Sequence, residues 1–315
     1  EVARDHDVLR RTFGDKKLTY AGFSYGSYLG AVYANLFPDR VRALVIDGVL
    51  DPVAWAGTPE TASIPQTERL RSGPAGWKAL QEILTRCGKA GEDLCSFASF
   101  GEPKAAYQNV VDGLKKAPLD VVDPDTGEVY LTVTYPLLVS WLLGDMYSPD
   151  GWELVDLDLT IVATLHAENA GSAEAKKANA KLLQRARQLR AAERAASRPA
   201  AGRAFGFPYE NGFEAFQSVL CNDGLNPPKA AGWAQAAARA DAEAPGFGPT
   251  WTWYSAPCAS STWTVRDEDA YRGPFTRISS NPVLVVGNYW DPATNYDGAV
   301  AADRLLGSSR LLDRK

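Results

Sequence analysis

A short stretch near the beginning of the sequence has the residue spacing of a reactive serine. Residues 18–26 read LTYAGFSYG, so a strand-like run ends in Gly22-x-Ser24-x-Gly26 and a helix of small residues follows. In a sharp turn from strand to helix, the serine is held in a strained backbone conformation with its side chain exposed. Glycine on either side lets other chain segments pass close to it. The pattern predicts acyl transfer through an ester of Ser24.

The elements that would position this serine follow one another along the chain. A strand is expected over residues 17–23, a helix over 27–37 and a second, buried strand over 41–46. Together they form a crossover unit with parallel strands. A further helix, over residues 1–13, precedes the first strand. Its larger apolar residues share one face: Val8, Leu9 and Phe13.

The chain from residue 51 to 280 is expected to fold as a separate, mostly helical insertion. It is richer in Ala, Trp, Pro and charge, has few strand-like runs, and shows helical periodicity most clearly over residues 178–189. Sheet character returns at residues 282–286. We therefore predict the α/β class, with a doubly wound sheet formed by residues 1–50 and 281–315. The insertion would form a cap over the carboxyl edge of the sheet, where open α/β sheets place their sites.

Composition excludes several classes of protein. The 315 residues carry a formal net charge of −5, which argues against nucleic acid as a partner. No apolar run approaches the length of about 18 residues that a membrane-spanning helix needs. A basic stretch over residues 176–194 is interpreted as the solvated face of a helix. No metal or organic cofactor is implied, and nothing indicates an oligomeric state.

The four cysteines fall into two local pairs. Cys87 and Cys95 lie eight residues apart, and Cys221 and Cys258 flank a second irregular stretch. This arrangement favours two disulfides and an exported protein. The alternative is four reduced thiols in a cytosolic protein. A zinc site is disfavoured, because no C-x-x-C occurs and neither histidine is near a cysteine pair.

Several ordered motifs resemble those of one known family. Residues 23–30 read FSYGSYLG, 37–41 read FPDRV, 47–52 read DGVLDP and 287–294 read GNYWDPAT. The set is similar to that of the actinomycete tripeptidyl aminopeptidases, secreted serine exopeptidases of the α/β-hydrolase fold that are related to prolyl aminopeptidases. The resemblance covers nearly the whole chain, is strong at residues 20–52 and 282–296, and is looser between them.

The resemblance implies roles for three residues. Ser24 would be the nucleophile, and the backbone N–H of Tyr25 would supply half of the oxyanion hole. Asp291 would be the acid that orients a histidine and stabilises its protonated form. Each side chain has a simpler alternative. Ser24 could be an ordinary turn serine, and Asp291 could cap the helix expected over residues 297–306.

The histidine of such a triad is missing from the expected place. The order in this fold is Ser, Asp, His, but the two histidines of the chain, His6 and His166, both precede Asp291. We expect both to be structural or surface residues. The family also places several βα units, of about 30 residues each, before the turn that carries the serine. We therefore expect the first strands, the second oxyanion donor and the catalytic histidine to lie outside residues 1–315.

An aminopeptidase must also bind the ammonium group of its substrate, and a carboxylate in the cap is the natural partner. The candidates are Glu210, Glu214 and Asp223, with surface carboxylates or helix caps as the alternative. Aromatic residues of the cap could line substrate subsites, although core packing is the default: Trp55, Tyr209, Phe213, Trp251, Trp253 and Trp263.

The function expected from these observations is a secreted serine hydrolase that releases short peptides, most simply tripeptides, from free N-termini. A secreted esterase on the same scaffold would use the same serine and acid on a small ester. A prolyl-type iminopeptidase would differ in the depth of its amine pocket. A non-catalytic binding protein with the α/β-hydrolase fold is the alternative from another class, and the missing histidine favours it.

Overall fold

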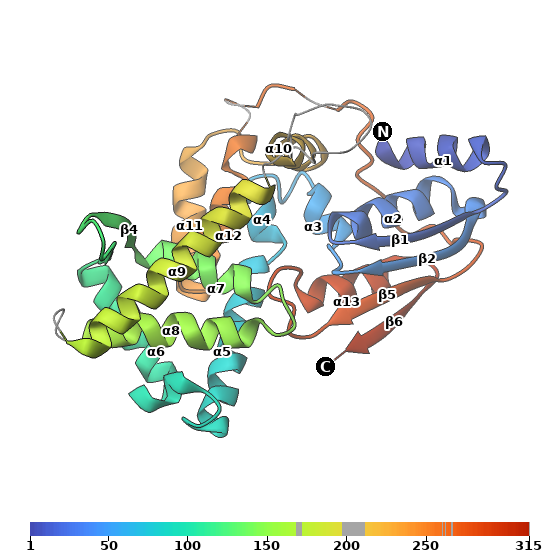
Figure 1. Ribbon diagram of the computed structural model, residues 1–315. Coiled ribbons are helices and arrows are strands. Elements are labelled where there is room, and N and C mark those ends of the chain that lie inside the picture. The colour runs from blue at the N-terminus through green and yellow to red at the C-terminus, as the bar shows by residue number, and fades with distance from the viewer. Residues whose placement is uncertain (168–171, 197–211, 260, 262, 266, 315) are drawn as a thin grey trace. The chain divides into compact units, whose positions relative to one another are not determined.

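The computed structural model describes residues 1–314 except 168–171, 197–211, 260, 262 and 266; the side chains of 192–196 and 213 are also outside the description. The chain divides into two compact units, one formed by residues 1–79 and 215–315 and the other by residues 80–214 (Figure 1). The division between core and cap expected from the sequence, at residues 51 and 280, stays a prediction.

The first unit contains a four-stranded parallel sheet. Its order is β1 (Leu18–Phe23), β2 (Val41–Asp47), β5 (Val283–Asn288) and β6 (Ser309–Arg314) (Figure 1). All four strands arise where the sequence has strand-like apolar runs, and the α/β fold class is confirmed. Because the strands are parallel, the loops that follow β1, β2 and β5 leave the same edge of the sheet.

Two helices pack on one face of this sheet. Helix α2 (Tyr25–Leu36) follows β1, and α13 (Tyr296–Leu305) follows β5. Gly30 of α2 lies so close to β2 that an added Cβ would stand 2.8 Å from Ile46 Cγ2. A Cβ on Gly287 of β5 would stand 3.2 Å from Ala299 of α13. The small residues therefore let both helices approach the sheet closely.

Helix α1 (Val2–Thr12) packs on α2 through a face that the apolar pattern did not indicate. Its buried residues are Ala3, Asp7 and Arg10. Arg10 Nε donates to Asp7 Oδ1 at 2.8 Å, and the Tyr33 hydroxyl of α2 donates to the same oxygen at 3.2 Å. The apolar residues noted in the sequence are exposed instead: Val8 by 49%, Leu9 by 52% and Phe13 by 79%.

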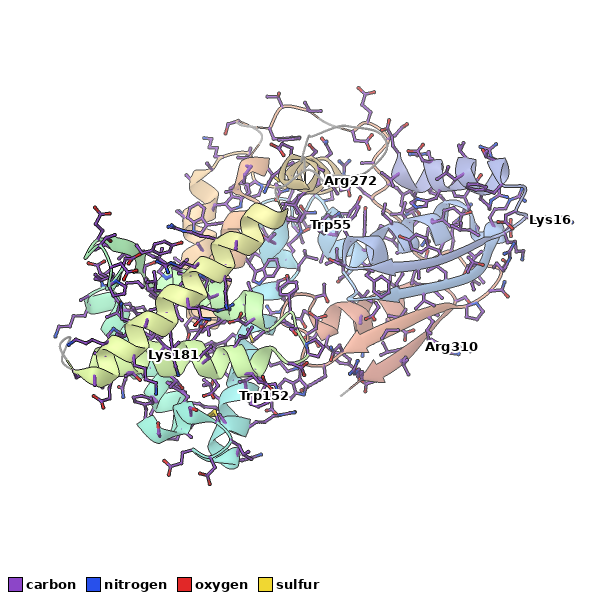
Figure 2. All side chains as sticks on the ribbon, viewed as in Figure 1. Lys16, Trp55, Trp152, Lys181, Arg272 and Arg310 are labelled. Atoms are coloured by element: carbon purple, nitrogen blue, oxygen red, sulfur yellow. A yellow bond between two sulfur atoms is a disulfide. The ribbon has the colours of Figure 1, made fainter. Side chains whose placement is uncertain are left out.

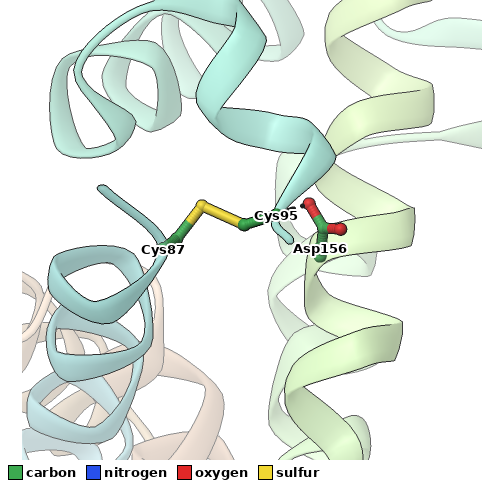
Figure 3. A group of neighbouring side chains, drawn as sticks. All are labelled: Cys87, Cys95 and Asp156. Atoms are coloured by element: carbon green, nitrogen blue, oxygen red, sulfur yellow. Dashed lines mark hydrogen bonds between the residues drawn. A yellow bond between two sulfur atoms is a disulfide. The ribbon is translucent and has the colours of Figure 1, made fainter. Parts of the chain in front are cut away.

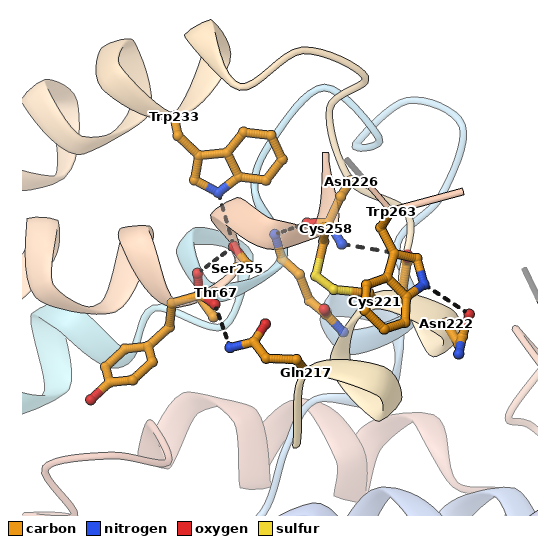
Figure 4. The surroundings of a disulfide bond; sticks show 12 residues. Thr67, Gln217, Cys221, Asn222, Asn226, Trp233, Ser255, Cys258 and Trp263 are labelled. Carbon is orange, nitrogen blue, oxygen red and sulfur yellow. Dashed lines mark hydrogen bonds between the residues drawn. A yellow bond between two sulfur atoms is a disulfide. The ribbon is translucent and has the colours of Figure 1, made fainter. Parts of the chain in front are cut away.

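The remainder of the first unit is helical and carries one disulfide. The helices are α3 (Pro52–Ala56), α4 (Gln66–Arg69), α5 (Ser72–Ala90), α10 (Gly212–Asp223), α11 (Ala231–Glu243) and α12 (Phe247–Tyr254), with short 3₁₀ turns at Pro38–Arg40 and Ala256–Cys258. Helix α5 continues into the second unit. Cys221 and Cys258 form the disulfide, and nearby Trp263 Nε1 donates to Asn222 Oδ1 at 3.2 Å (Figure 4).

The second unit is a helical bundle with one hairpin. Its elements are the 3₁₀ turn Ser96–Phe100, α6 (Pro103–Lys116), β3 (Leu119–Val122), β4 (Val129–Val133), α7 (Tyr135–Asp145), α8 (Gly151–Ala167) and α9 (Ala173–Ala196). The antiparallel hairpin was not expected, because its strands are only four and five residues long.

The second disulfide joins Cys87 at the end of α5 to Cys95 (Figure 3). Asp156 of α8 accepts backbone N–H groups from Ser96 at 3.0 Å and Phe97 at 2.7 Å, so it holds the 3₁₀ turn that follows. Both cysteine pairs of the sequence are therefore bridged. Among the helices of the described residues, none is long and apolar enough to cross a membrane.

Candidate active site

Ser24 lies between the end of β1 and the first residue of α2, in a strained conformation. Its φ of 53° is in a region that residues other than glycine rarely adopt. The Ser24 N–H donates to the Asp47 carbonyl at 3.1 Å, which ties the turn to the end of β2. An added Cβ on Gly22 would stand 2.2 Å from the Gly26 carbonyl oxygen. The first glycine of the motif is therefore required by close approach of backbone to backbone.

Two side chains donate hydrogen bonds to backbone carbonyls of this turn. The Tyr20 hydroxyl donates to the Gly26 carbonyl at 2.7 Å. Ser27 Oγ donates to the Ser24 carbonyl at 2.5 Å and accepts the Leu50 N–H at 2.9 Å, and Ser27 is fully buried. The strained serine is thus fixed on both sides by groups that the sequence did not single out.

Asp291 lies on the loop after β5, with its carboxylate oriented by local bonds. Oδ1 accepts the N–H groups of Ala293 at 2.8 Å and Thr294 at 2.7 Å, and Oδ2 accepts Thr294 Oγ1 at 2.6 Å. The N-cap of α13 is Asn295, whose side chain accepts the Asp297 N–H. The sequence had left open that Asp291 caps this helix instead of acting in catalysis. In the structure, Asn295 is the N-cap.

Gly48 lies close to both the serine turn and the loop of Asp291. It follows β2 with a φ of +58°, and an added Cβ would stand 3.4 Å from both the Ser24 amide nitrogen and Thr294 Oγ1. The two predicted residues of the triad therefore belong to one cluster at the carboxyl edge of the sheet. Thr294 was part of the DPAT motif, but no role for it was recognised from sequence.

Lys78 of α5 contacts the same loop at Tyr289. Its Nζ donates to the Tyr289 carbonyl at 3.2 Å and lies 3.1 Å from the centroid of the Tyr289 ring. Trp290, directly before Asp291, stacks edge-on against Tyr289. No sequence signal links Lys78 to Asp291, because more than 200 residues separate them.

Neither histidine is hydrogen-bonded to Ser24 or Asp291 within the described residues. His6 is on α1, where its Nδ1 lies 2.8 Å from the Val2 carbonyl and its ring contacts Tyr20 edge-on. His166 is on α8 of the second unit, where it packs against Gly113 and burial lowers its pKa. Both occupy structural settings.

Of the three candidate acids, Asp223 lies beside the serine turn. Its Oδ2 accepts the Tyr25 hydroxyl at 2.8 Å and Trp55 Nε1 at 3.2 Å. Burial raises the pKa of Asp223 above its usual value. Arg272 Nε donates to the Asp223 backbone carbonyl at 3.3 Å, and Trp55 and Arg272 mark this region in Figure 2. Glu214 is exposed on α10, and Glu210 lies outside the described residues.

Some of the aromatic candidates are packed against other residues, and others are exposed to solvent. Trp55 stacks on Tyr25 with ring centroids 5.3 Å apart, and Trp263 packs against the core of the first unit. Trp251 contacts Tyr254, whereas Trp253 is 48% exposed. Tyr209 and the side chain of Phe213 lie outside the described residues. Trp55 is therefore the aromatic candidate whose contacts reach the residue next to Ser24.

Comparison with known proteins shows which families the chain is similar to. The family described as alpha/beta hydrolase fold matches residues 1–72, and the one described as TAP-like protein matches residues 243–315. Tripeptidyl aminopeptidase of Streptomyces lividans is 29% identical over 323 residues, which covers 100% of this chain and 51% of the relative. The chain is therefore similar over its whole length to tripeptidyl aminopeptidases, and two of its segments match the α/β-hydrolase and TAP-like families. The resemblance inferred from the sequence motifs is confirmed.

The names of other relatives of the chain state other activities. Serine protease Hip1 of Mycobacterium tuberculosis is 32% identical over 161 residues, covering 48% of this chain and 28% of the relative. Carboxylesterase B of the same species is 29% identical over 315 residues, covering 98% of this chain and 52% of the relative. The chain spans about half the length of the tripeptidyl aminopeptidases and the carboxylesterase it matches.

The two family matches cover separate segments of the chain. Ser24 lies in the first matched segment and Asp291 in the second. Residues 80–214, the compact helical unit, lie outside both. The matched segments therefore coincide with the sheet that carries the candidate site.

Proposed function

We propose that the protein containing this chain is a serine peptidase that removes short peptides from free N-termini through an acyl-enzyme on Ser24. The observation that carries the proposal is the Ser24 turn, strained at a φ of 53° and next to the turn of Asp291 and Thr294. Relatives named tripeptidyl aminopeptidase and serine protease support a peptide substrate. Two disulfides support an exported protein.

The proposed reaction uses the residues in the following way. Ser24 Oγ attacks the scissile carbonyl while a histidine takes its proton, and Asp291 orients that histidine. Tyr25 opens α2, so its N–H has no acceptor within the helix and can donate to the oxyanion. The amine leaves with the proton, and water then hydrolyses the ester. In this proposal the base is a third histidine, one that is not among residues 1–315.

An esterase is the second candidate, because a relative named carboxylesterase B matches 98% of the chain. Ester and amide hydrolysis use the same nucleophile and acid, so the geometry of Ser24 and Asp291 fits both. A binding protein without catalysis is less well supported, because it would have no use for a strained serine held by Tyr20 and Ser27.

The test uses the full-length protein and a fluorophosphonate probe. We expect labelling that is lost in Ser24→Ala, and faster turnover of a tripeptide p-nitroanilide than of a p-nitrophenyl ester at equal concentration. Turnover of the ester alone would favour the esterase. A wild-type protein that is folded but not labelled would contradict the proposal of a serine nucleophile.

A further inference from the structure

Helix α5 contacts the loop that carries Asp291 on both sides of the acid. Gly76 of α5 lies so close that an added Cβ would stand 3.1 Å from the carbonyl oxygen of Pro292. Lys78, two residues further along the helix, donates from Nζ to the Tyr289 carbonyl at 3.2 Å. Pro292 follows Asp291 directly, and Tyr289 precedes it by two residues. The helix is therefore placed to hold the loop at the acid itself.

The ammonium group of Lys78 lies against a backbone carbonyl and the face of an aromatic ring. It is 3.1 Å from the centroid of the Tyr289 ring and 5.1 Å from that of Trp290. No described carboxylate, that of Asp291 included, forms an ion pair with Lys78. The side chain is half-buried, and the attraction of a cation to a ring increases as water is excluded. The charge of Lys78 therefore acts on Tyr289.

Tyr289 connects this contact to the segment that bears the acid. Its N–H donates to the carbonyl of Arg314 in β6 at 2.9 Å, which fixes its backbone to the sheet. Its ring meets Trp290 and Tyr296 edge-on, with centroids 4.9 Å and 5.3 Å away. Trp290 precedes Asp291 directly, and Tyr296 is the first residue of α13. A movement of Tyr289 would therefore displace both ends of this segment.

The hydrogen bonds of Asp291 itself are local. Its carboxylate accepts from Ala293 and Thr294, which belong to the same turn. Bonds of this kind orient the carboxylate within the turn, but they move with it. A contact from outside the turn is needed to hold the turn as a whole, and Lys78 supplies one through Tyr289.

We propose that Lys78 is a positioning residue for catalysis: its ammonium group holds Tyr289 and thereby keeps Asp291 where it can orient the histidine. This rests on the proposed function, since it assumes that Asp291 is the acid of a triad. Lys78 touches neither the substrate nor the reacting atoms. Displacement of a positioned group by about 1 Å can lower a rate roughly 100-fold, so such a contact affects kcat.

The first test measures steady-state kinetics of Lys78→Met in the full-length protein. Methionine is a flexible apolar side chain without the charge that attracts the Tyr289 ring. On whichever substrate wild type turns over, we expect kcat to fall roughly 10- to 100-fold with KM little changed. Lys78→Arg, whose guanidinium can stack on the ring, should recover most of kcat. Lys89→Met, exposed in the last turn of the same helix, should match wild type.

The pH dependence of kcat/KM separates positioning from a direct effect of charge. Its acidic limb reports the pKa of the histidine in the free enzyme. A well-placed carboxylate raises that pKa, so displacement of Asp291 in Lys78→Met should move the limb to lower pH. If Lys78 acted only through its positive charge, its removal would raise the pKa and move the limb to higher pH. A limb that stays in place or moves to higher pH would overturn the proposal.

A double-mutant cycle tests the route through Tyr289. Tyr289→Leu removes the ring that Lys78 contacts, so it should lower kcat and move the acidic limb to lower pH by itself. Because both substitutions break one contact, the double variant should lose no more than the larger of the two single losses. Losses that multiply would show that the residues act separately and would contradict the proposal. If Lys78→Met does not fold, an unmoved limb in Tyr289→Leu would also contradict it.

Fluorophosphonate labelling distinguishes failure of this proposal from failure of the proposed function. Labelling of Ser24 uses the same histidine and acid, so Lys78→Met should be labelled more slowly than wild type but to the same final extent. Labelling and turnover at the wild-type rate in Lys78→Met would overturn only the role of Lys78. A folded wild-type protein that is not labelled would overturn the proposed function.

Discussion

Thr294 holds Asp291 through two hydrogen bonds, one from its hydroxyl to Oδ2 at 2.6 Å and one from its N–H to Oδ1 at 2.7 Å. The same hydroxyl stands 3.4 Å from the point that a Cβ on Gly48 would occupy, beside the Ser24 amide. Thr294 is therefore the side chain that links the orientation of the acid to the position of the serine turn.

Thr294→Val should weaken catalysis without preventing folding. It keeps the shape and the backbone N–H but removes a hydrogen bond to a charged group, which is typically worth about 1.5–3 kcal/mol. We expect kcat to fall roughly 10- to 100-fold with KM little changed. Steady-state kinetics of the full-length enzyme measures this. Thr294→Ser should restore most of kcat, and a loss shared equally by both variants would contradict a role in orienting Asp291.

Gly22→Ala should prevent formation of the serine turn. The new methyl group would stand 2.2 Å from the Gly26 carbonyl oxygen, a backbone atom that cannot move away cheaply. Overpacking of this kind costs about 3 kcal/mol. Urea unfolding followed by circular dichroism measures the loss. Gly144→Ala is the matched control, because a Cβ there meets nothing within 4 Å, and it should be neutral or slightly stabilising.

The serine turn and its strands could be predicted because their signals are local. β1, α2 and β2 are consecutive, so periodicity and the glycine spacing of residues 22–26 locate the nucleophile within a few residues. Asp291 was inferred from the family resemblance of its motif at residues 287–294, which follows β5. Asp223 could not be distinguished from Glu214 in the same way, because its contact with Tyr25 joins residues 198 positions apart.

The buried face of α1 shows a second limit of prediction from the sequence. Hydrophobic spacing selected Val8, Leu9 and Phe13, yet the helix buries a charged pair, Asp7 with Arg10. Such a pair can be buried only where the partner surface supplies a matching donor, here the Tyr33 hydroxyl. A pattern that counts only apolar residues cannot recognise this.

The two disulfides should differ in their contribution to stability. Cys221 and Cys258 are 37 residues apart and Cys87 and Cys95 only eight. Loop-closure entropy then gives about 4 kcal/mol for the first bridge and about 2.5 kcal/mol for the second. Paired Cys→Ser variants, compared by urea unfolding, should show the larger loss for Cys221 and Cys258. An equal or reversed order would mean that strain or denatured-state structure outweighs loop length.

The buried pair on α1 should make the first unit sensitive to acid. The hydrogen bond from Arg10 lowers the pKa of Asp7 below its ordinary value of 3.8. Its stabilisation is therefore present above that value and is lost as the pH falls towards the pKa of the folded state. Asp7→Asn should be clearly less stable than wild type at pH 6, and the difference should shrink by pH 3. Thermal unfolding at both pH values tests this, with Asp5→Asn, exposed on the same helix, as the control; a difference that stays constant with pH would mean that Asp7 contributes through packing rather than charge.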